Sequence, residues 1–558
     1  MFKVEYRDGL ARTSKLIVRG KEISLPNIAI VVNPNKLVVP PKELEREFGA
    51  QIIITNAYII KKSKFKEEAV SKGLHDLLDF NGVIFTDSGA YQMFSQKVKD
   101  VNPKEIVEFQ VEIDSDIITP LDSFVLPKDS KDVAEKKVLE TINVVRESKS
   151  LIPEDRFYVT PVQGGKYSDL RKYCASHVHS YGDLIAIGGL APLLMKYEFK
   201  DVVNTIIECK KSMPLNKPIH CFGAGHPMSF SLLVAAGCDL FDSAMYSLAA
   251  EQGRYLTPRG TLNLSELEEF PCSCPVCSSY TPRELLREEK KQRTYLLAKH
   301  NLYVTFSELK EIKEKIKKGR LLTMLHYRAR AHPKLLGGFI ELLREHGEWI
   351  EEIDPIYKDT EIFEAGEETR YRPEVIRARK WVKRVKTTDK IEVQVFGTIP
   401  QSLLNTYPFN KLTPKPKPLK INVKEIIDYC YGRNASKYFE QLNTIKTKGE
   451  IKILVNNVEA GKISLETGLF EPNIYGANLL KKSLPPPKAR VIVEKVKPII
   501  KTSEVLFCDS ELRIGQLALI VDPQDNLLGI GKLLLSPFEI KTIENHEAVS
   551  LVELATIH

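Results

Sequence analysis

The sequence predicts an α/β protein built on a (β/α)8 barrel, and three observations support this fold class. Eight short apolar or β-branched runs occur between residues 27 and 242, amphipathic segments lie between most of them, and each run ends in a polar or glycine-rich break. Eight alternations of strand and helix over roughly 200 residues are typical of a closed parallel barrel. A doubly wound open sheet is the competing arrangement.

The predicted strands and helices alternate along this part of the chain. The strands are Asn27–Val32, Gln51–Thr55, Gly82–Thr86, Asp116–Pro120, Phe157–Val162, Leu184–Ile187, Pro218–Phe222 and Asp239–Phe241. Between them, apolar residues recur at helical spacing. The clearest helices are Lys64–Leu78, Pro103–Ile113, Lys131–Ser148, Tyr167–Ser180 and Tyr197–Lys211.

The breaks after the strands contain most of the polar side chains of interest. They are Asn33-Pro34, Thr55-Asn56, Asp87-Ser88-Gly89, Asp122-Ser123, Gln163-Gly164-Gly165, Gly188 to Pro192, Gly223 to His226 and Asp242-Ser243. In a closed barrel the carboxyl ends of all strands open on one rim, where active sites collect. Three carboxylates, a carboxamide and a histidine on one rim predict a functional site there.

A cysteine cluster follows the barrel. Cys272, Cys274 and Cys277 form a Cys-x-Cys-x-x-Cys pattern, and His300 lies further along. Zn²⁺ prefers four such ligands in a tetrahedron, so we expect one zinc ion per chain. Because four protein ligands leave no open position, the predicted metal is structural. Three reduced cysteines that are close by chance are the alternative.

The remainder of the chain predicts smaller units. Residues 303 to 350 look helical, and the basic stretch Arg377–Lys386 and the Pro/Lys-rich Leu412–Lys420 predict a surface segment and a linker. The last unit is rich in predicted strands, and its glycines are placed as in a small β-barrel. We therefore divide the chain into a catalytic barrel at 1–350 with the zinc site at 272–300, a basic connecting domain at 351–421, a small α/β module at 422–484 and a β-barrel-like domain at 485–558.

Composition limits the class of protein. The 558 residues are 43% hydrophobic and 28% charged, and the formal charge of +8 permits an anionic partner without requiring one. No apolar run is long enough to span a bilayer, and the first residues lack the apolar core of a signal peptide. Nine cysteines do not form a disulfide framework in a chain of this length. These features predict a cytoplasmic protein.

Five separated motifs resemble one enzyme family. They are Thr86-Asp87-Ser88-Gly89-Ala90-Tyr91-Gln92, Val162-Gln163-Gly164-Gly165, Gly188-Gly189-Leu190-Ala191, Phe241-Asp242-Ser243-Ala244 and the Cys/Cys/Cys/His set. Together they resemble the tRNA-guanine transglycosylases, and the stretch Asp242–Thr261 with the additional domains resembles the archaeal, archaeosine-type branch. The last unit is similar to a PUA domain, an RNA-binding module. Ala90 is a small departure, since bacterial relatives usually carry glycine there.

The resemblance implies an activity and a role for each site residue. The enzyme would replace guanine at position 15 in the D arm of tRNA with 7-cyano-7-deazaguanine (preQ0), through a covalent enzyme-RNA intermediate. Asp242 would be the nucleophile and Asp87 the general acid/base, while a substrate-binding set would hold the base, namely Asp122, Gln163, Gly189 and Tyr91. The resemblance also implies a homodimer.

The chemistry requires the same residue types independently of the resemblance. Base exchange with retained configuration is a double displacement, in which one carboxylate forms the covalent bond and another group moves the proton. A guanine taken out of the RNA stack also needs acceptors and donors at its edge. Asp122 can accept from the N1 and exocyclic amino groups, and Gln163 and the Gly189 amide can donate to the carbonyl.

From the sequence alone, purely structural roles for these residues stay open. Gln163 and Asp122 can be hydrogen bonds that tie loops together, Asp242 can be a helix N-cap, and Tyr91 can be a packing residue. For His226 we expect a local structural role, because the mechanism needs no imidazole. Two other functions remain as alternatives: a queuosine-type enzyme acting at the anticodon, and a non-catalytic tRNA-binding barrel.

Overall fold

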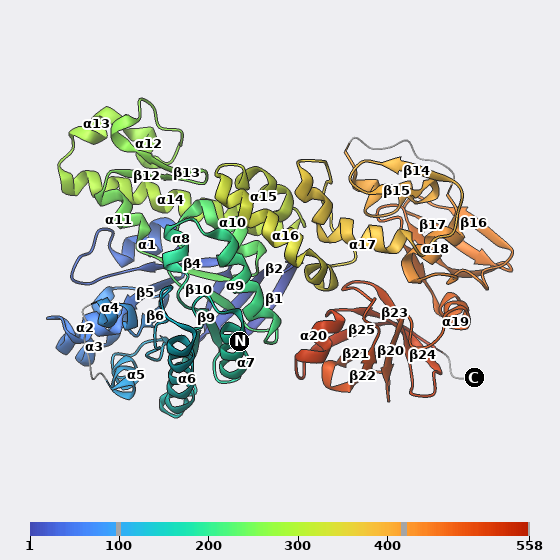
Figure 1. The fold of residues 1–558 in the computed structure, drawn as a ribbon, viewed down its shortest axis with the longest axis horizontal. Helices are drawn as coiled ribbons and strands as arrows, with labels where there is room; N and C mark the ends of the chain where they lie inside the picture. The colour runs from blue at the N-terminus through green and yellow to red at the C-terminus, as the bar shows by residue number, and fades with distance from the viewer. Residues whose placement is uncertain (96–101, 414–420, 556–558) are drawn as a thin grey trace. The chain divides into compact units, whose positions relative to one another are not determined.

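The structure is a computed structural model that describes residues 1–95, 102–413 and 421–555 (Figure 1). The chain divides into two compact units. The first contains residues 1–7, 11–317 and 324–342, and the second contains residues 8–10, 318–323 and 343–558.

A closed parallel barrel forms the centre of the first unit, which confirms the predicted fold class and excludes the open sheet. The barrel order is β10-β11-β4-β5-β6-β7-β8-β9. All eight strands begin and end within two residues of the predicted ranges, and β7 is the shortest. They are β4 (Asn27–Val31), β5 (Ile52–Asn56), β6 (Val83–Asp87), β7 (Ile117–Ile118), β8 (Phe157–Val162), β9 (Leu184–Ile187), β10 (Ile219–Cys221) and β11 (Leu240–Ser243).

The strand β7 is shorter than predicted because the side chain of Gln110, instead of an adjacent strand, pairs with the backbone of Thr119. Gln110 donates from Nε2 to the Thr119 carbonyl at 2.8 Å and accepts from the Thr119 amide at 3.0 Å. Both backbone groups of Thr119 are therefore satisfied by a helix rather than by an adjacent strand.

Helices surround the barrel, and several begin at side-chain caps. Asn56, Asn102 and Ser130 accept from amides in the first turns of α2, α5 and α6. The helices up to the end of the barrel are α1 (Pro41–Phe48), α2 (Ala57–Lys61), α3 (Lys66–Leu78), α4 (Ala90–Ser95), α5 (Pro103–Glu112), α6 (Lys131–Ser148), α7 (Ser168–Val178), α8 (Ala191–Met195), α9 (Phe199–Lys211), α10 (Pro227–Ala235) and α11 (Met245–Glu251).

A small antiparallel sheet covers the amino-terminal end of the barrel. It consists of β1 (Phe2–Asp8), β2 (Ala11–Val18) and β3 (Lys21–Leu25). Leu16, Val18 and Ile23 belong to the same buried cluster as barrel side chains near strand starts, such as Ile52 and Val83. This end is therefore closed largely by apolar side chains, with the buried ion pair Arg12–Asp239 beside them.

The region that contains the Cys/His cluster follows the barrel within the first unit. The hairpin of β12 (Arg254–Thr257) and β13 (Gly260–Asn263) packs with the long helix α14 (Lys290–Lys317). Between them are α12 (Pro275–Ser279) and α13 (Pro282–Arg287). The helices α15 (Leu321–Ala329) and α16 (Pro333–Ile353) come next in the chain.

The second unit combines helices with three sheets. Two are antiparallel: the hairpin β14 (Lys390–Val393) with β15 (Gly397–Pro400), and a four-stranded sheet in the order β16-β17-β18-β19. The third has six strands in the order β21-β25-β24-β23-β20-β22. The bounds are α17 (Pro373–Val382), α18 (Val423–Tyr431), β16 (Leu442–Lys446), β17 (Glu450–Val455), β18 (Val458–Ser464), β19 (Phe470–Pro472), α19 (Ile474–Ser483), β20 (Arg490–Val493), β21 (Ile499–Lys501), β22 (Val505–Cys508), β23 (Leu517–Val521), β24 (Leu527–Leu533), α20 (Pro537–Thr542) and β25 (Glu547–Leu554).

The prediction of a surface segment at Arg377–Lys386 is wrong for its first half. Arg377 and Trp381 lie on α17 and are buried. The Arg377 guanidinium lies 3.3 Å from Asp354, which also pairs with the buried Lys358. Residues 414–420 of the predicted linker lie outside the described residues. Within the described ranges, none of the helices combines the length and hydropathy needed to cross a bilayer.

Candidate active site

A cavity of about 420 Å³ opens at the carboxyl ends of the barrel strands. Five of the predicted site residues line it, and they come from loops or strand ends far apart in the sequence: Asp87, Asp122, Gln163, Gly189 and Asp242. The remaining lining is largely apolar and includes Val31, Ile54, Phe124 and Phe222. A mostly apolar pocket with a few convergent polar groups suits a flat organic ligand.

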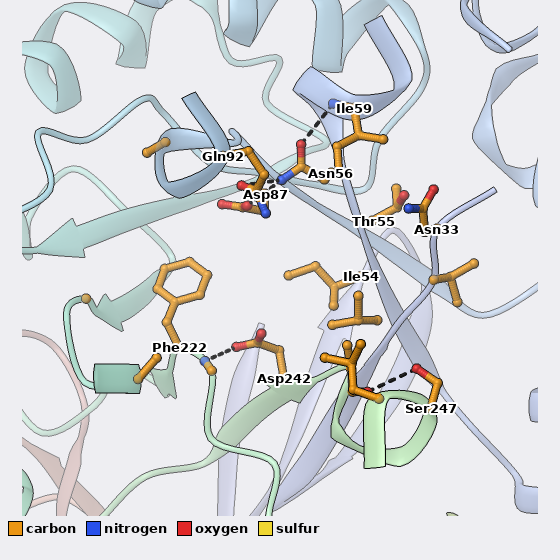
Figure 2. Close-up of a pocket in the computed structure, with 18 of the residues that line it drawn as sticks. Asn33, Ile54, Thr55, Asn56, Ile59, Asp87, Gln92, Phe222, Asp242 and Ser247 are labelled. Carbon is orange, nitrogen blue, oxygen red and sulfur yellow. Dashed lines mark hydrogen bonds between the residues drawn. The ribbon is translucent and has the colours of Figure 1, made fainter. Parts of the chain in front are cut away.

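Asp87 and Asp242 occupy opposite walls of this cavity (Figure 2). Asp87 ends β6, where it lies opposite Asn56 of β5 in the strand register. Asn56 donates from Nδ2 to Asp87 Oδ2 at 2.8 Å, and its own oxygen accepts from the Ile59 amide at 3.0 Å. The cap of α2 therefore also fixes the orientation of the Asp87 carboxyl group.

Burial and neighbouring charge change the proton affinity of Asp87. Burial is the largest cause that raises its pKa, and the negative charges of Asp122 and Asp242 add to it. Hydrogen bonds from Gly89 and Asn56 oppose these effects, and together they bring the pKa to about 7. Burial also raises the pKa of Asp122. A carboxyl group whose pKa lies near neutrality can both donate and accept a proton at physiological pH.

Asp242 is held by two donors at the end of β11. Its Oδ1 accepts from the Gly223 amide at 2.8 Å and lies 2.9 Å from His220 Nε2. The helix that follows is capped at Ala244 without a side-chain bond, so Asp242 is not an N-cap.

Gln163 and Asp122 contact each other. Gln163 donates from Nε2 to Asp122 Oδ2 at 2.5 Å, and its oxygen accepts from the Val125 amide at 3.3 Å. The pair therefore ties two loops together, which is the structural role considered from the sequence, and both residues also line the cavity. One N–H of the Gln163 amide remains for a ligand.

The glycines at positions 188 and 189 allow the loop after β9 to lie close to this pair. A Cβ on residue 188 would come within 2.4 Å of Gln163 Nε2, and Gly189 has φ +73°. Side chains at either position would disturb the pocket.

Arg171, which no motif in the sequence singles out, lies on α7 and is 1% exposed. Its guanidinium donates to the carbonyls of Val162, Gly165 and Gly188 at 2.8 to 3.0 Å. It therefore joins the loops after β8 and β9, and burial lowers its pKa. A basic residue within an amphipathic helix gives no sequence signal of such a role.

His226 has the local structural role that the sequence analysis expected. Its Nδ1 accepts from the Met228 amide at the start of α10, and its Nε2 lies 2.8 Å from the Thr261 hydroxyl. Burial lowers the pKa of His226 to about 4. Tyr91 lies in α4, but its side chain is outside the described part of the structure.

The four predicted metal ligands converge. One ligand atom each from Cys272, Cys274, Cys277 and His300 lie within 4.8 Å of one another. His300 Nε2 lies 3.0 Å from the Leu256 carbonyl, which leaves Nδ1 directed at the sulfurs. Tyr255 stacks on the His300 ring with centroids 3.6 Å apart. A cluster of this kind can bind a metal ion, and the donor set fits Zn²⁺.

The barrel and its rim place the protein in a general class: a (β/α)8 barrel whose rim carries two facing carboxylates in a largely apolar cavity. Residues 8–334 match the family model described as queuine tRNA-ribosyltransferase. The chain belongs to this family.

Relatives cover the whole chain. Proteins named tRNA-guanine(15) transglycosylase are 40% identical in Pyrococcus abyssi, over 99% of this chain and 97% of the relative, and 39% identical in Thermococcus onnurineus, over 99% and 98%. In Methanocaldococcus jannaschii the identity is 36%, over 99% and 98%. The similarity therefore includes the second unit as well as the barrel.

Proposed function

We propose that this protein is a tRNA-guanine transglycosylase that exchanges guanine at position 15 of the D arm for preQ0, in archaeosine synthesis. The observation that carries the proposal is the pair Asp87 and Asp242 on opposite walls of one cavity. The full-length relatives named for position 15 support the choice of nucleoside.

The first displacement begins at Asp242. Its carboxylate attacks C1′ of the nucleoside, the C1′–N9 bond breaks, and the electron pair passes to the departing guanine. Asp87 supplies the proton that neutralises this base, because its pKa of about 7 keeps part of the population protonated at neutral pH.

The second displacement reverses these roles. Asp87, now ionised, accepts the N9 proton of the incoming base, and that nitrogen attacks C1′. The ester bond to Asp242 breaks and the carboxylate is restored. Two inversions at C1′ retain the configuration of the nucleoside.

The same pocket recognises both bases. Asp122 accepts from the N1–H and the exocyclic amino group, and Gln163 and the Gly189 amide donate to the carbonyl oxygen. The apolar walls near Phe124 and Phe222 contact the faces of the base. We include Tyr91 in this set on the strength of the resemblance.

The other parts of the chain serve RNA binding and folding. Zn²⁺ bound by the Cys/His cluster would stabilise the region between β12 and α14. The six-stranded sheet after residue 485 would act as a PUA domain that contacts tRNA. We propose that the enzyme works as a homodimer in the cytoplasm, where its tRNA substrate is found.

Two observations weigh against the alternatives. An anticodon-specific enzyme would not need the second unit, whereas the relatives named for position 15 share it. A non-catalytic barrel would have no need to retain three carboxylates that converge on one cavity.

Substitution of the nucleophile tests the activity. Asp242→Asn is expected to abolish exchange of labelled guanine into a tRNA transcript and to abolish covalent RNA trapping on a denaturing gel. The circular dichroism spectrum should stay unchanged. Exchange at the wild-type rate in this variant would contradict the proposal.

A further inference from the structure

His220 is a buried histidine that contacts Asp242 and has no role in the proposed displacements. His220 lies in the middle of β10, is 0% exposed, and has its Nε2 2.9 Å from Asp242 Oδ1. Its ring packs against two phenyl rings, with centroids 4.4 Å from Phe222 and 5.3 Å from Phe85.

The surroundings of His220 determine which nitrogen carries the proton. Among the described residues, its Nδ1 has no hydrogen-bond partner. A doubly protonated ring would bury an unsatisfied N–H beside two phenyl rings, which is costly. An ionised carboxylate can only accept, so the neutral tautomer with its proton on Nε2 satisfies the pair.

The two donors leave the carboxylate asymmetric. Gly223 and His220 both donate to Oδ1, and within the described part of the chain no donor reaches Oδ2. In Figure 2 the bonded oxygen of Asp242 faces the loop after Phe222, and the other oxygen faces the cavity. Oδ2 is therefore the atom that can reach C1′.

From this geometry, and given the proposed function, we infer that His220 is a positioning residue that selects Oδ2 as the attacking atom and limits the lifetime of the covalent intermediate. When Oδ2 forms the ester, Oδ1 becomes a neutral carbonyl oxygen. Hydrogen bonds to a charged acceptor are stronger than those to a neutral one, so the two donors favour the free carboxylate over the ester. The donor on His220 therefore helps the carboxylate to leave in the second displacement.

The balance between ester and free carboxylate can be measured directly. Enzyme and tRNA form adduct and free guanine, and added guanine reverses the reaction. The guanine concentration that halves the amount of trapped adduct, called here the half-effect concentration, therefore reports the equilibrium between ester and free carboxylate. If a hydrogen bond stabilises the free carboxylate relative to the ester by about 1 kcal/mol, its loss should raise the half-effect concentration about fivefold.

Three variants separate the donor from the ring. His220→Phe keeps an aromatic ring without a donor. His220→Gln and His220→Asn carry the same amide group, but only the longer glutamine side chain reaches as far as Nε2. We expect an increase of about fivefold in the half-effect concentration for Phe and Asn, with slower exchange, and a value near wild type for Gln.

The control is His326→Phe, a buried histidine on α15 that does not line the cavity. It should leave the half-effect concentration unchanged, and thermal unfolding of every variant reports folding separately. If His220→Phe does not fold, the Asn and Gln pair carries the test alone.

The outcomes distinguish the two levels of the account. Absence of any adduct or exchange in the wild-type protein would contradict the proposed function itself. The inference about His220 is overturned if the wild type forms adduct but His220→Gln and His220→Asn have equal half-effect concentrations. This holds whether both values match the wild type or both are raised.

Discussion

Asp87 acquires its high proton affinity mainly from burial and, to a smaller extent, from the negative charges of Asp122 and Asp242. Its pKa of about 7 lies well above the value of an unfolded aspartate, about 3.9. Between these two values the folded protein binds the proton and the unfolded chain does not. Stability is therefore expected to fall as the pH rises from about 4 to 7.

Asp87→Asn should remove this cost. We expect its unfolding free energy at pH 8 to exceed that of the wild type by about 2 kcal/mol, less than the full shift implies because Asp87 borders an open cavity. The difference should vanish below pH 4, as followed by urea unfolding. Glu112→Gln, at an exposed position, is the control, and a destabilised Asp87→Asn protein at pH 8 would contradict this assignment.

The same substitution tests the role of Asp87 in catalysis. Loss of the acid/base group should slow guanine exchange by at least about 100-fold. The wild-type rate should change with pH around 7, and this dependence should disappear in Asp87→Asn while tRNA binding persists. An unchanged pH profile in the variant would assign the proton transfer to another group.

Single side chains also connect whole elements, and Arg171 is the clearest case. Because it satisfies three carbonyls in the loops after β8 and β9, Arg171→Met should lower the unfolding free energy by about 2 to 4 kcal/mol. The KM for the free base should rise about tenfold, more than kcat falls, since the Gly188 loop loses its support. Lys172→Met changes the next residue, which is half exposed, and should alter neither value.

The Cys/His cluster stabilises a different element. Cys274→Ala is expected to lose the bound metal in elemental analysis and to increase protease cleavage between residues 254 and 300. The barrel should stay folded, because the cluster lies outside it. Full metal content in the variant, or well under one zinc per chain in the wild type, would contradict the assignment.

For the whole molecule, RNA binding depends on where the basic side chains lie more than on the net charge of +8. Lys495 and Lys501 are exposed around β21. If this sheet contacts tRNA, neutralising both should weaken binding and reduce the slope of log K against log salt by about 2. Substituting the exposed Lys72 and Lys136 on α3 and α6 is the matched control, and equal effects in both pairs would argue against a dedicated RNA surface.

Substitutions suit this test better than deletion of the last sheet. Leu519, Val521 and Ile530 belong to a buried cluster whose other members are apolar residues between positions 362 and 489. Removing residues 488–558 would expose that core and confuse loss of binding with loss of folding.

The sequence predicts the barrel well because its signal is local and repeated. Each strand is an apolar run that ends at a break, so convergence of Asp87, Asp122 and Asp242 follows from closure alone. What the sequence does not contain is the partner of each side chain. His220 looks like part of a strand, and Arg171 like part of a helix, until tertiary contacts place them. The burial of Arg377 is a further case, because its acid partner Asp354 is distant in sequence.

Exchange of the base at position 15 is tested by mapping where a labelled base enters tRNA. The wild-type enzyme would be incubated with labelled preQ0 and a tRNA transcript, and the labelled nucleotide located by nuclease digestion. Label is expected at position 15 only, with no label when Asp242→Asn replaces the wild type. Label in the anticodon, or none with the wild-type protein, would contradict exchange at position 15.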